Sequence, residues 1–290
     1  RKTETSLEEL AALMIGRGSD AMIKTASKAS SDQIVMKIRD LHVAMPGEMV
    51  RGIDLDVRQG EIIGLGGLAG QGKVGLPNGI MGIYHAEGDV EFMGEKLPLN
   101  NAREALKRGL AMVSEDRRGV GLLLDQSIED NIVFNAIEIN NDFCVGPSFM
   151  RIKSSSAIRK YADEMIKELD IRCFGPTQHA GTLSGGNQQK VCVARALAVH
   201  PKFLFVSEPT RGIDIGAKQL VLETLAKLNR EKGITIVMVS SELNELRSIC
   251  DRIAIVSEGK IADILKPNAS DISFGLAMSG IKVQERSDLA

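Results

Sequence analysis

Several features that would suggest a function at once are absent or scarce in this sequence. The four cysteines have no paired spacing, so neither a disulfide framework nor a cysteine-based metal site is expected. The longest apolar runs, at 203–206 and 234–239, are strand-sized and far below the roughly 18 residues of a membrane-spanning helix. The net charge is only −2, which gives no overall case for binding nucleic acid.

The remaining composition is that of an ordinary globular protein, with 43% hydrophobic and 26% charged residues in 290. Strand-like segments alternate with helix-sized patterns, and this alternation predicts an α/β fold with a mainly parallel sheet. Strands are expected at 34–39, 52–57, 61–67, 109–113, 203–207, 234–240 and 252–257. Helices are expected from about Gly72 and at 184–199, 215–230 and 242–250.

The two ends of the alternating region suggest a domain organisation. Residues 1–17 have the pattern of a short amphipathic helix, and the small polar residues of 18–32 read as a linker. One domain is then expected over 33–290. Residues 120–182 interrupt the alternation, and we interpret them as a helical insertion between two parts of the sheet domain.

The stretch GLAGQGKV, residues 67–74, follows an expected strand and precedes an expected helix. In this setting a glycine-rich turn brings backbone N–H groups close to phosphate oxygens, and Lys73 can reach the β and γ phosphates. A phosphate loop normally continues with Ser or Thr, whose hydroxyl binds Mg²⁺. Val74 has no such group.

Two other interpretations of this stretch stay open on its residues alone. The segment 70–75 also matches the G-x-G-x-x-G pattern of a dinucleotide-binding turn, with Glu91 or Glu95 near the required distance. Alternatively, the glycines form a tight turn that binds nothing.

Two later stretches carry further chemistry. In LSGGNQQK, residues 183–190, a Ser-Gly-Gly turn stands at the start of an expected helix and offers a second place for an anion. In SEPTRGID, residues 207–214, an apolar strand ends at Glu208. A carboxylate at the carboxyl end of a strand can orient or deprotonate an attacking water.

Together these motifs resemble those of ABC-type ATPases, because GLAGQGKV, LSGGNQQK, SEPTRGID and VSSEL (239–243) occur in the family's order. The resemblance covers about residues 33–265 and is greatest to the second ATPase half of tandem importers of the ribose, galactose and xylose type. It implies a P-loop fold with a mainly parallel sheet, an antiparallel β part and a helical subdomain. It also implies that this chain is the C-terminal portion of a longer polypeptide.

The resemblance assigns roles to individual residues, with ATP and Mg²⁺ as the ligands. Glu208 would be the catalytic carboxylate, and Asp214 would contact the other ATPase half. The nucleotide of this domain would be held by Gly67, Leu68, Ala69, Gly70, Gln71, Gly72, Lys73, Val74, Glu115 and Ser241. The signature that faces the partner half's nucleotide would be Leu183, Ser184, Gly185, Gly186, Asn187 and Gln188.

Some positions depart from the family's pattern. Val74 replaces the Mg²⁺-binding hydroxyl, and Ser207 stands in place of the aspartate that positions Mg²⁺, leaving at most a contact through water. Glu115 and Ser241 replace the usual glutamine and histidine, and residues 43–50 offer no aromatic ring to stack on adenine. We therefore expect an impaired Mg·ATP site that coexists with a working signature.

The partners implied are the first ATPase half, a transmembrane permease and, indirectly, a periplasmic or extracellular binding protein, without nucleic acid. The helical insertion would face the permease at the cytoplasmic side of the bacterial membrane. Two alternatives remain, which are a non-hydrolysing regulatory ABC module and an ABC ATPase outside transport.

Overall fold

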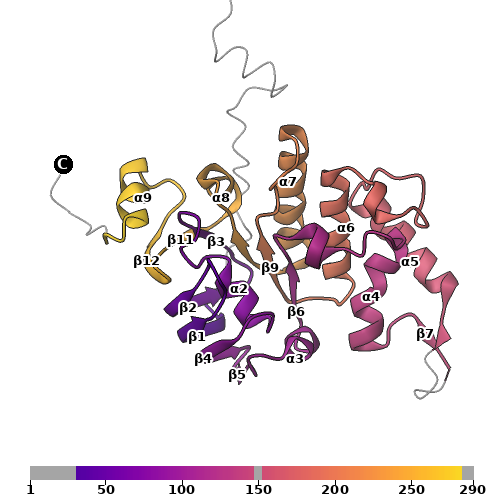
Figure 1. Cartoon of the computed structure of the whole chain (residues 1–290), viewed down its shortest axis with the longest axis horizontal. Coiled ribbons are helices and arrows are strands. Elements are labelled where there is room, and N and C mark those ends of the chain that lie inside the picture. The colour runs from indigo at the N-terminus through magenta and orange to yellow at the C-terminus, as the bar shows by residue number, and fades with distance from the viewer. Residues whose placement is uncertain (1–30, 147–151, 283–290) are drawn as a thin grey trace, which may run out of the picture.

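The structure is a computed structural model that describes residues 31–146 and 152–282 (Figure 1). The helix expected at 1–17 and most of the linker expected at 18–32 lie outside these residues. In the part of the chain that is described, no helix is both long and apolar enough to cross a membrane.

A mainly parallel sheet forms the centre of the molecule. Across the sheet its strands run in the order β12 (Lys260–Leu265), β11 (Arg252–Ser257), β3 (Ile62–Gly66), β10 (Thr235–Val239), β9 (Phe203–Ser207) and β6 (Leu110–Val113). Neighbouring strands are parallel except for β12, which pairs antiparallel with β11. The strands expected near 61–67, 109–113, 203–207, 234–240 and 252–257 are therefore confirmed.

These strands read as continuous apolar runs because both faces of the sheet are covered. In β9, Phe203 and Phe205 contribute to one hydrophobic core while Leu204 and Val206 contribute to the other. Side chains alternate between the two faces of a strand, so each face needs its own apolar residues. The two cores hold the sheet between a β layer and a helical layer.

The β layer is an antiparallel sheet with the strand order β2 (Val50–Arg58), β1 (Ile34–Val43), β4 (Ala86–Phe92) and β5 (Glu95–Lys96). Its inward side chains share a core with Phe203 and Phe205. The edge of the Phe92 ring meets Phe203 with centroids 5.8 Å apart. Figure 1 shows this layer below the central sheet.

The opposite face of the central sheet packs against helices. The core there includes buried residues of α6 (Gly185–Leu197), α7 (Ile215–Lys232), α8 (Leu243–Ile249) and α9 (Asp271–Met278). Asp214 starts α7, because its carboxylate accepts a hydrogen bond from Ala217 N, and Gly233 ends the helix in the left-handed conformation. The helix α3 (Ala102–Lys107) precedes the edge strand β6.

The segment expected to be helical contains two long helices, α4 (Ile128–Asn140) and α5 (Ser155–Glu168). Ser127 and Ser154 cap them through hydrogen bonds to backbone N–H groups of the first turn. Two short helical turns, η1 (Arg117–Gly121) and η2 (Ala180–Thr182), and the strands β7 (Cys144–Val145) and β8 (Ile152–Lys153) complete the region. Figure 1 shows α4 and α5 on the side of the molecule away from the antiparallel sheet.

One expected boundary is wrong. The helix expected from about Gly72 begins three residues later, as α2 (Gly75–Ile80). The loop before it cannot be helical, since Gly70 and Gly72 have φ values of +77° and +99°, a conformation that glycine adopts without strain.

Candidate nucleotide site and signature helix

The carboxyl ends of three neighbouring parallel strands bring the candidate site together. Gly67 follows β3, Ser240 follows β10 and Glu208 follows β9, and these strands are paired in that order. In open α/β sheets this edge is where ligands bind. Segments far apart in the sequence therefore meet here because the sheet aligns their ends.

The phosphate loop wraps around its own lysine. The Lys73 side chain is only 1% exposed, and its ammonium donates a hydrogen bond to the Leu68 carbonyl at 3.2 Å. Gln71 points to the turn after β11, where its side-chain oxygen accepts from Glu258 N and its backbone oxygen accepts from Gly259 N. These contacts fix the shape of the loop.

The residue after Lys73 is a buried valine, without the hydroxyl that a phosphate loop normally has at this position. Val74 is buried, and its carbonyl accepts a hydrogen bond from the Asn78 side chain at 2.9 Å. The same amide group lies 3.4 Å from Glu115 Oε1, which places Glu115 beside the phosphate loop. Glu115 is thus near the site, as the resemblance implied.

Ser207 is the last residue of β9 and has no exposed surface. Its hydroxyl has no hydrogen-bond partner among the described residues. A buried hydroxyl without a hydrogen-bond partner lowers the stability of the folded chain.

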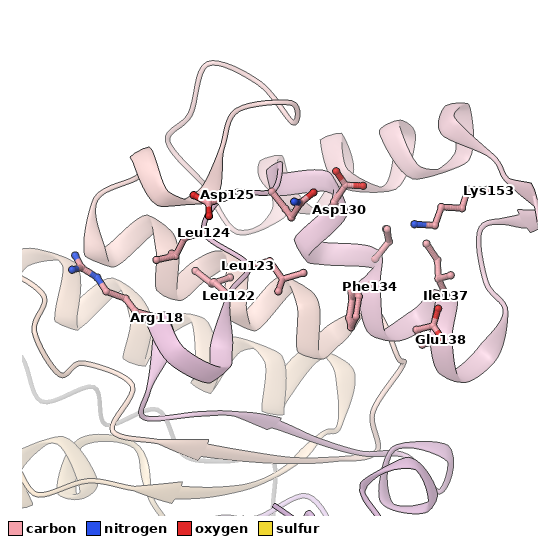
Figure 2. A pocket seen from close by; sticks show the side chains of 12 residues that line it. Arg118, Leu122, Leu123, Leu124, Asp125, Asp130, Phe134, Ile137, Glu138 and Lys153 are labelled. Atoms are coloured by element: carbon pink, nitrogen blue, oxygen red, sulfur yellow. The ribbon is translucent and has the colours of Figure 1, made fainter.

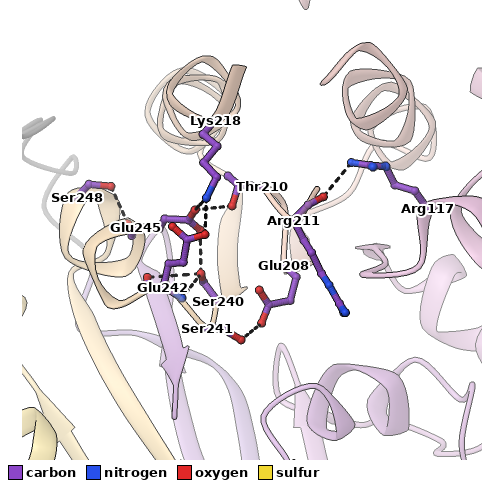
Figure 3. Close-up of polar contacts among 10 residues, drawn as sticks. All are labelled: Arg117, Glu208, Thr210, Arg211, Lys218, Ser240, Ser241, Glu242, Glu245 and Ser248. Carbon is purple, nitrogen blue, oxygen red and sulfur yellow. Dashed lines mark hydrogen bonds and ion pairs between the residues drawn. The ribbon is translucent and has the colours of Figure 1, made fainter. Parts of the chain in front are cut away.

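Glu208 and Ser241 meet at the same edge. Ser241 Oγ donates a hydrogen bond to Glu208 Oε1 at 2.6 Å (Figure 3). Glu208 has a φ of +46°, and its backbone N–H donates to the Val239 carbonyl at 2.8 Å. The neighbouring strand therefore holds the glutamate in an unusual conformation that places its carboxylate against Ser241.

The buried carboxylate of Glu245 connects the segments that carry Glu208 and Ser241. Glu245 accepts hydrogen bonds from Thr210, just after Glu208, and from Ser240, just before Ser241 (Figure 3). Lys218 of α7 forms ion pairs with Glu245 and Glu242. Burial raises the pKa of Glu245, the two hydroxyl hydrogen bonds lower it, Glu242 raises it, and Lys218 lowers it, with a net upward shift.

The signature stretch begins α6, with Ser184 as the residue before the helix. Ser184 is exposed, and its hydroxyl accepts a hydrogen bond from Asn187. Leu183 and Gln188, by contrast, are only 8% and 2% exposed. Of the six residues predicted to face a partner's nucleotide, Leu183, Gly186 and Gln188 are buried in their own domain, and Ser184 presents an accessible hydroxyl.

A close approach explains the glycine at 185. A Cβ atom there would lie 3.2 Å from the Gly212 carbonyl and 3.4 Å from the Arg117 guanidinium. Arg117 also donates a hydrogen bond to the Arg211 carbonyl at 3.2 Å (Figure 3). The start of the signature helix therefore packs on the segment that leads to Asp214.

A separate pocket of about 580 Å³ lies between the segment after η1 and α4 (Figure 2). Its lining combines apolar side chains, among them the exposed Leu123 and Phe134, with charged ones such as Arg118 and Glu138. It shares no lining residue with the phosphate loop, so it is a distinct surface of the helical region.

The residues do not suit a metal ion held by the protein. The Val74 side chain offers no oxygen, and Ser207 offers only a buried neutral hydroxyl. Among the described residues no cluster of three His, Cys, Asp or Glu side chains could hold a metal. Mg²⁺ prefers an octahedral set of oxygen ligands, and this site does not supply the protein's share.

Comparison with known proteins shows the family to which the chain belongs. A sequence model described as "ABC transporter" matches residues 50–211, and the chain belongs to this family. A dimeric bacterial ABC transporter cassette of known structure is 26% identical and superposes with a TM-score of 0.65, covering 81% of this chain and 100% of that one. A nucleotide-free ATP-binding cassette, 22% identical, shows the same fold with a TM-score of 0.68 over 85% of this chain and 96% of its own. The expected ABC-type P-loop fold is thus confirmed.

Among proteins of known name, ribose import ATP-binding proteins are similar to this chain. Ribose import ATP-binding protein RbsA of Halalkalibacterium halodurans is 36% identical over 265 residues, which is 91% of this chain and 50% of that protein. The protein of the same name from Lactococcus lactis is 36% identical over 266 residues, 91% of this chain and 51% of its own length. The chain spans about half the length of the curated relatives it matches.

The sequence motifs did not identify every residue of the site. Glu48 contacts the phosphate loop, and Arg117 contacts the start of the signature helix. Glu245 contacts the segments after β9 and β10. None of these three residues belongs to a motif used above. One signal was available for the first of them. Gly75 lies outside the phosphate-loop pattern, and an additional glycine marks a close approach by another segment.

Proposed function

We propose that this chain is one ATP-binding half of an ABC importer for ribose or a related small solute, with its own Mg·ATP site weakened. Its signature helix completes the active site of a first ATPase half on the same polypeptide. The observation that carries the proposal is the pairing of an accessible Ser184 with a phosphate loop that has no side-chain hydroxyl at Val74. The names and double length of the similar proteins support the transport role and a second half.

The chemistry of the two composite sites would then be unequal. In the site built on this phosphate loop, Glu208 would orient the attacking water, and Ser241 would hold the glutamate in place. Because Val74 has no side-chain oxygen and Ser207 offers only a neutral hydroxyl where a carboxylate is expected, this site would turn over slowly. The signature supplies backbone N–H groups and a hydroxyl to the other nucleotide and needs none of these groups.

A membrane permease is the other partner in this proposal. The pocket beside α4 offers exposed Leu123 and Phe134 between charged side chains, a suitable surface for a cytoplasmic segment of such a protein (Figure 2). The chain would then work at the cytoplasmic face of the bacterial membrane. A binding protein would contact the permease and not this chain.

The test is solute uptake by the longer polypeptide together with its permease in sealed vesicles. ATP-dependent uptake of radiolabelled ribose is expected, and Gly185→Asp in this half should reduce it about a hundredfold or more, as loss of a transition-state donor does. Ser156→Ala, on an exposed face of α5, should leave it unchanged. No ATP-dependent uptake of any pentose or hexose would refute the transport role.

A second candidate is a regulatory ABC module that binds nucleotide without hydrolysing it. The paired changes at Val74 and Ser207 favour it. Val74→Thr together with Ser207→Asp should restore Mg²⁺-dependent nucleotide binding to the chain. Binding that stays indifferent to Mg²⁺ in this double variant would show that the two positions do not cause the weakness.

A further inference from the structure

The phosphate loop already holds an anion that belongs to its own chain. One carboxylate oxygen of Glu48 accepts a hydrogen bond from Gly70 N at 2.8 Å. The other accepts from Gly72 N at 2.8 Å and from Val74 N at 3.3 Å. These alternate N–H groups of the loop are those expected to bind phosphate oxygens.

The contact involves more than one side chain. The backbone of residues 47–49 lies directly on the loop, since a Cβ atom at Gly72 would come within 2.5 Å of the Met49 carbonyl. A Cβ atom at Gly75 would come within 2.0 Å of the Glu48 carbonyl. Glycine at both positions makes room for the segment, and Gly75 is not required by the phosphate-loop pattern.

Residues 47–51 are also hydrogen-bonded to the turn after β11. Arg51 N donates to the Gly259 carbonyl at 2.8 Å, and Gly259 N donates to the Gln71 carbonyl at 2.9 Å. Residues 47–51, the phosphate loop and the turn after β11 therefore form one hydrogen-bonded unit. Glu48 is seated by this unit and is not a freely moving surface side chain.

We propose that Glu48 is an internal competitor that sets the nucleotide affinity of this phosphate loop. The inference rests on the proposed function in that it treats the loop as a nucleotide site. A triphosphate and the Glu48 carboxylate carry like charge and need the same N–H groups, so they exclude each other. Nucleotide binds only when Glu48 has left, which lowers the apparent affinity by the fraction of time that the loop is free.

The experiment measures binding of ATP and of inorganic pyrophosphate to the whole chain by calorimetry. A carboxylate seated for 90–99% of the time weakens binding about 10- to 100-fold, so Glu48→Gln and Glu48→Ala should tighten both ligands by about that factor. Glu258→Gln removes an equal charge from the neighbouring turn without vacating the N–H groups, and it should bind as the unaltered chain does. Adding Lys73→Ala to Glu48→Gln should remove the gain.

A second readout does not depend on nucleotide. Hydrogen exchange at the amides of Gly70 and Gly72 should speed up in Glu48→Ala, because their acceptor is gone, while the amides of β3 keep their protection. This comparison also shows whether the variant is folded.

The outcomes separate this inference from the proposed function. Equal affinities of Glu48→Gln and the unaltered chain, or no binding by either, would overturn the role of Glu48 while leaving ribose uptake by the longer polypeptide to decide the transport role. Tighter binding in Glu48→Gln, together with no uptake of any sugar, would support the competitor and refute the importer.

Discussion

At the residue scale, the site differs from a fully equipped nucleotide site at two buried positions. Val74 and Ser207 sit where a hydroxyl and a carboxylate are expected, and both are shielded from solvent. Lys73 and Glu208 match the family's pattern at the loop and the sheet edge, whereas Glu115 and Ser241 stand in place of its usual glutamine and histidine. The departures at Val74 and Ser207 therefore concern the groups that would place a metal ion, whereas the lysine and the glutamate of the pattern are kept.

The buried hydroxyl of Ser207 gives a prediction about stability. Ser207→Ala removes a group that has no partner among the described residues, so the free energy of unfolding should rise by about 1 kcal/mol. Urea unfolding of the chain measures it. Ser240→Ala is the matched control, because its hydroxyl donates to Glu245, and its loss should cost about 1–3 kcal/mol. A loss of stability in Ser207→Ala would show that the hydroxyl has a partner.

The sequence predicted where residues of the short motifs lie in the fold, while their roles stay predictions. The glycines of 67–72, Lys73, Ser184 and Glu208 could be located because each lies next to a strand or helix end that the pattern marks. Glu48 could not be located, since its contacts join residues 22 and 24 positions apart. The Pro46–Gly47 turn that precedes it is a local signal, but it does not show which segment Glu48 packs against. Burial of Leu183 and Gln188 likewise depends on tertiary packing and not on their motif.

At the element scale, neighbouring strand ends position the loops, and Glu245 of α8 ties two of them together. Its carboxylate receives hydrogen bonds from Thr210 and Ser240, which flank the Glu208–Ser241 contact. A change in the charge of Glu245 would therefore change the hydrogen bonds that hold the segments around the Glu208–Ser241 contact.

This arrangement makes stability depend on pH in a defined direction. The pKa of Glu245 is raised in the folded chain, mainly by burial, so the folded state binds its proton more tightly than the unfolded state. Its stabilising contribution is complete below the ordinary glutamate pKa of about 4.3 and is lost as the pH rises through the raised value. The stability of the unaltered chain relative to Glu245→Gln should thus fall as the pH rises above about 4.3.

Denaturant unfolding at several pH values gives this difference. Glu223→Gln, on the exposed face of α7, controls for the loss of one carboxylate elsewhere. A difference between the unaltered chain and Glu245→Gln that is constant with pH, or that grows as the pH rises, would contradict the assignment.

The short helix α2 gives a second prediction at this scale. Its first residue, Gly75, packs against the Glu48 carbonyl, and a methyl group there forces the segments apart. Gly75→Ala should lower the free energy of unfolding by about 1–3 kcal/mol, as overpacking does. Gly275→Ala in α9 meets no atom within 4 Å and should stabilise the chain by up to about 1 kcal/mol, measured by the same urea unfolding. Equal effects of the two substitutions would mean that the segment of Glu48 can move aside to accommodate a methyl group at Gly75.

Predictions of whole elements from the sequence succeeded where periodicity was strong. The buried parallel strands and α6, α7 and α8 were located within a few residues, because apolar runs and helical spacing are local signals. The start of α2 was misplaced, since Gly70 and Gly72 adopt positive φ values that keep the chain in a loop as far as Val74.

At the scale of the whole molecule, the central sheet lies between an antiparallel β layer and a helical layer, with α4 and α5 at one end (Figure 1). The phosphate loop follows β3 of the central sheet, whereas the signature helix α6 follows the short turn η2 and belongs to the helical layer. A single domain can therefore offer its signature to a second domain while its own loop is restrained. The proposed division of labour between two halves follows from this separation.

The most direct measurement compares two substitutions in the longer polypeptide. Lys73→Ala disables the phosphate loop of this half, and Gly185→Asp disables its signature. The account predicts that Gly185→Asp lowers the ATPase rate about a hundredfold or more, whereas Lys73→Ala lowers it about twofold. A large loss for Lys73→Ala with little effect of Gly185→Asp would contradict the account, because this half would then act through its own nucleotide site.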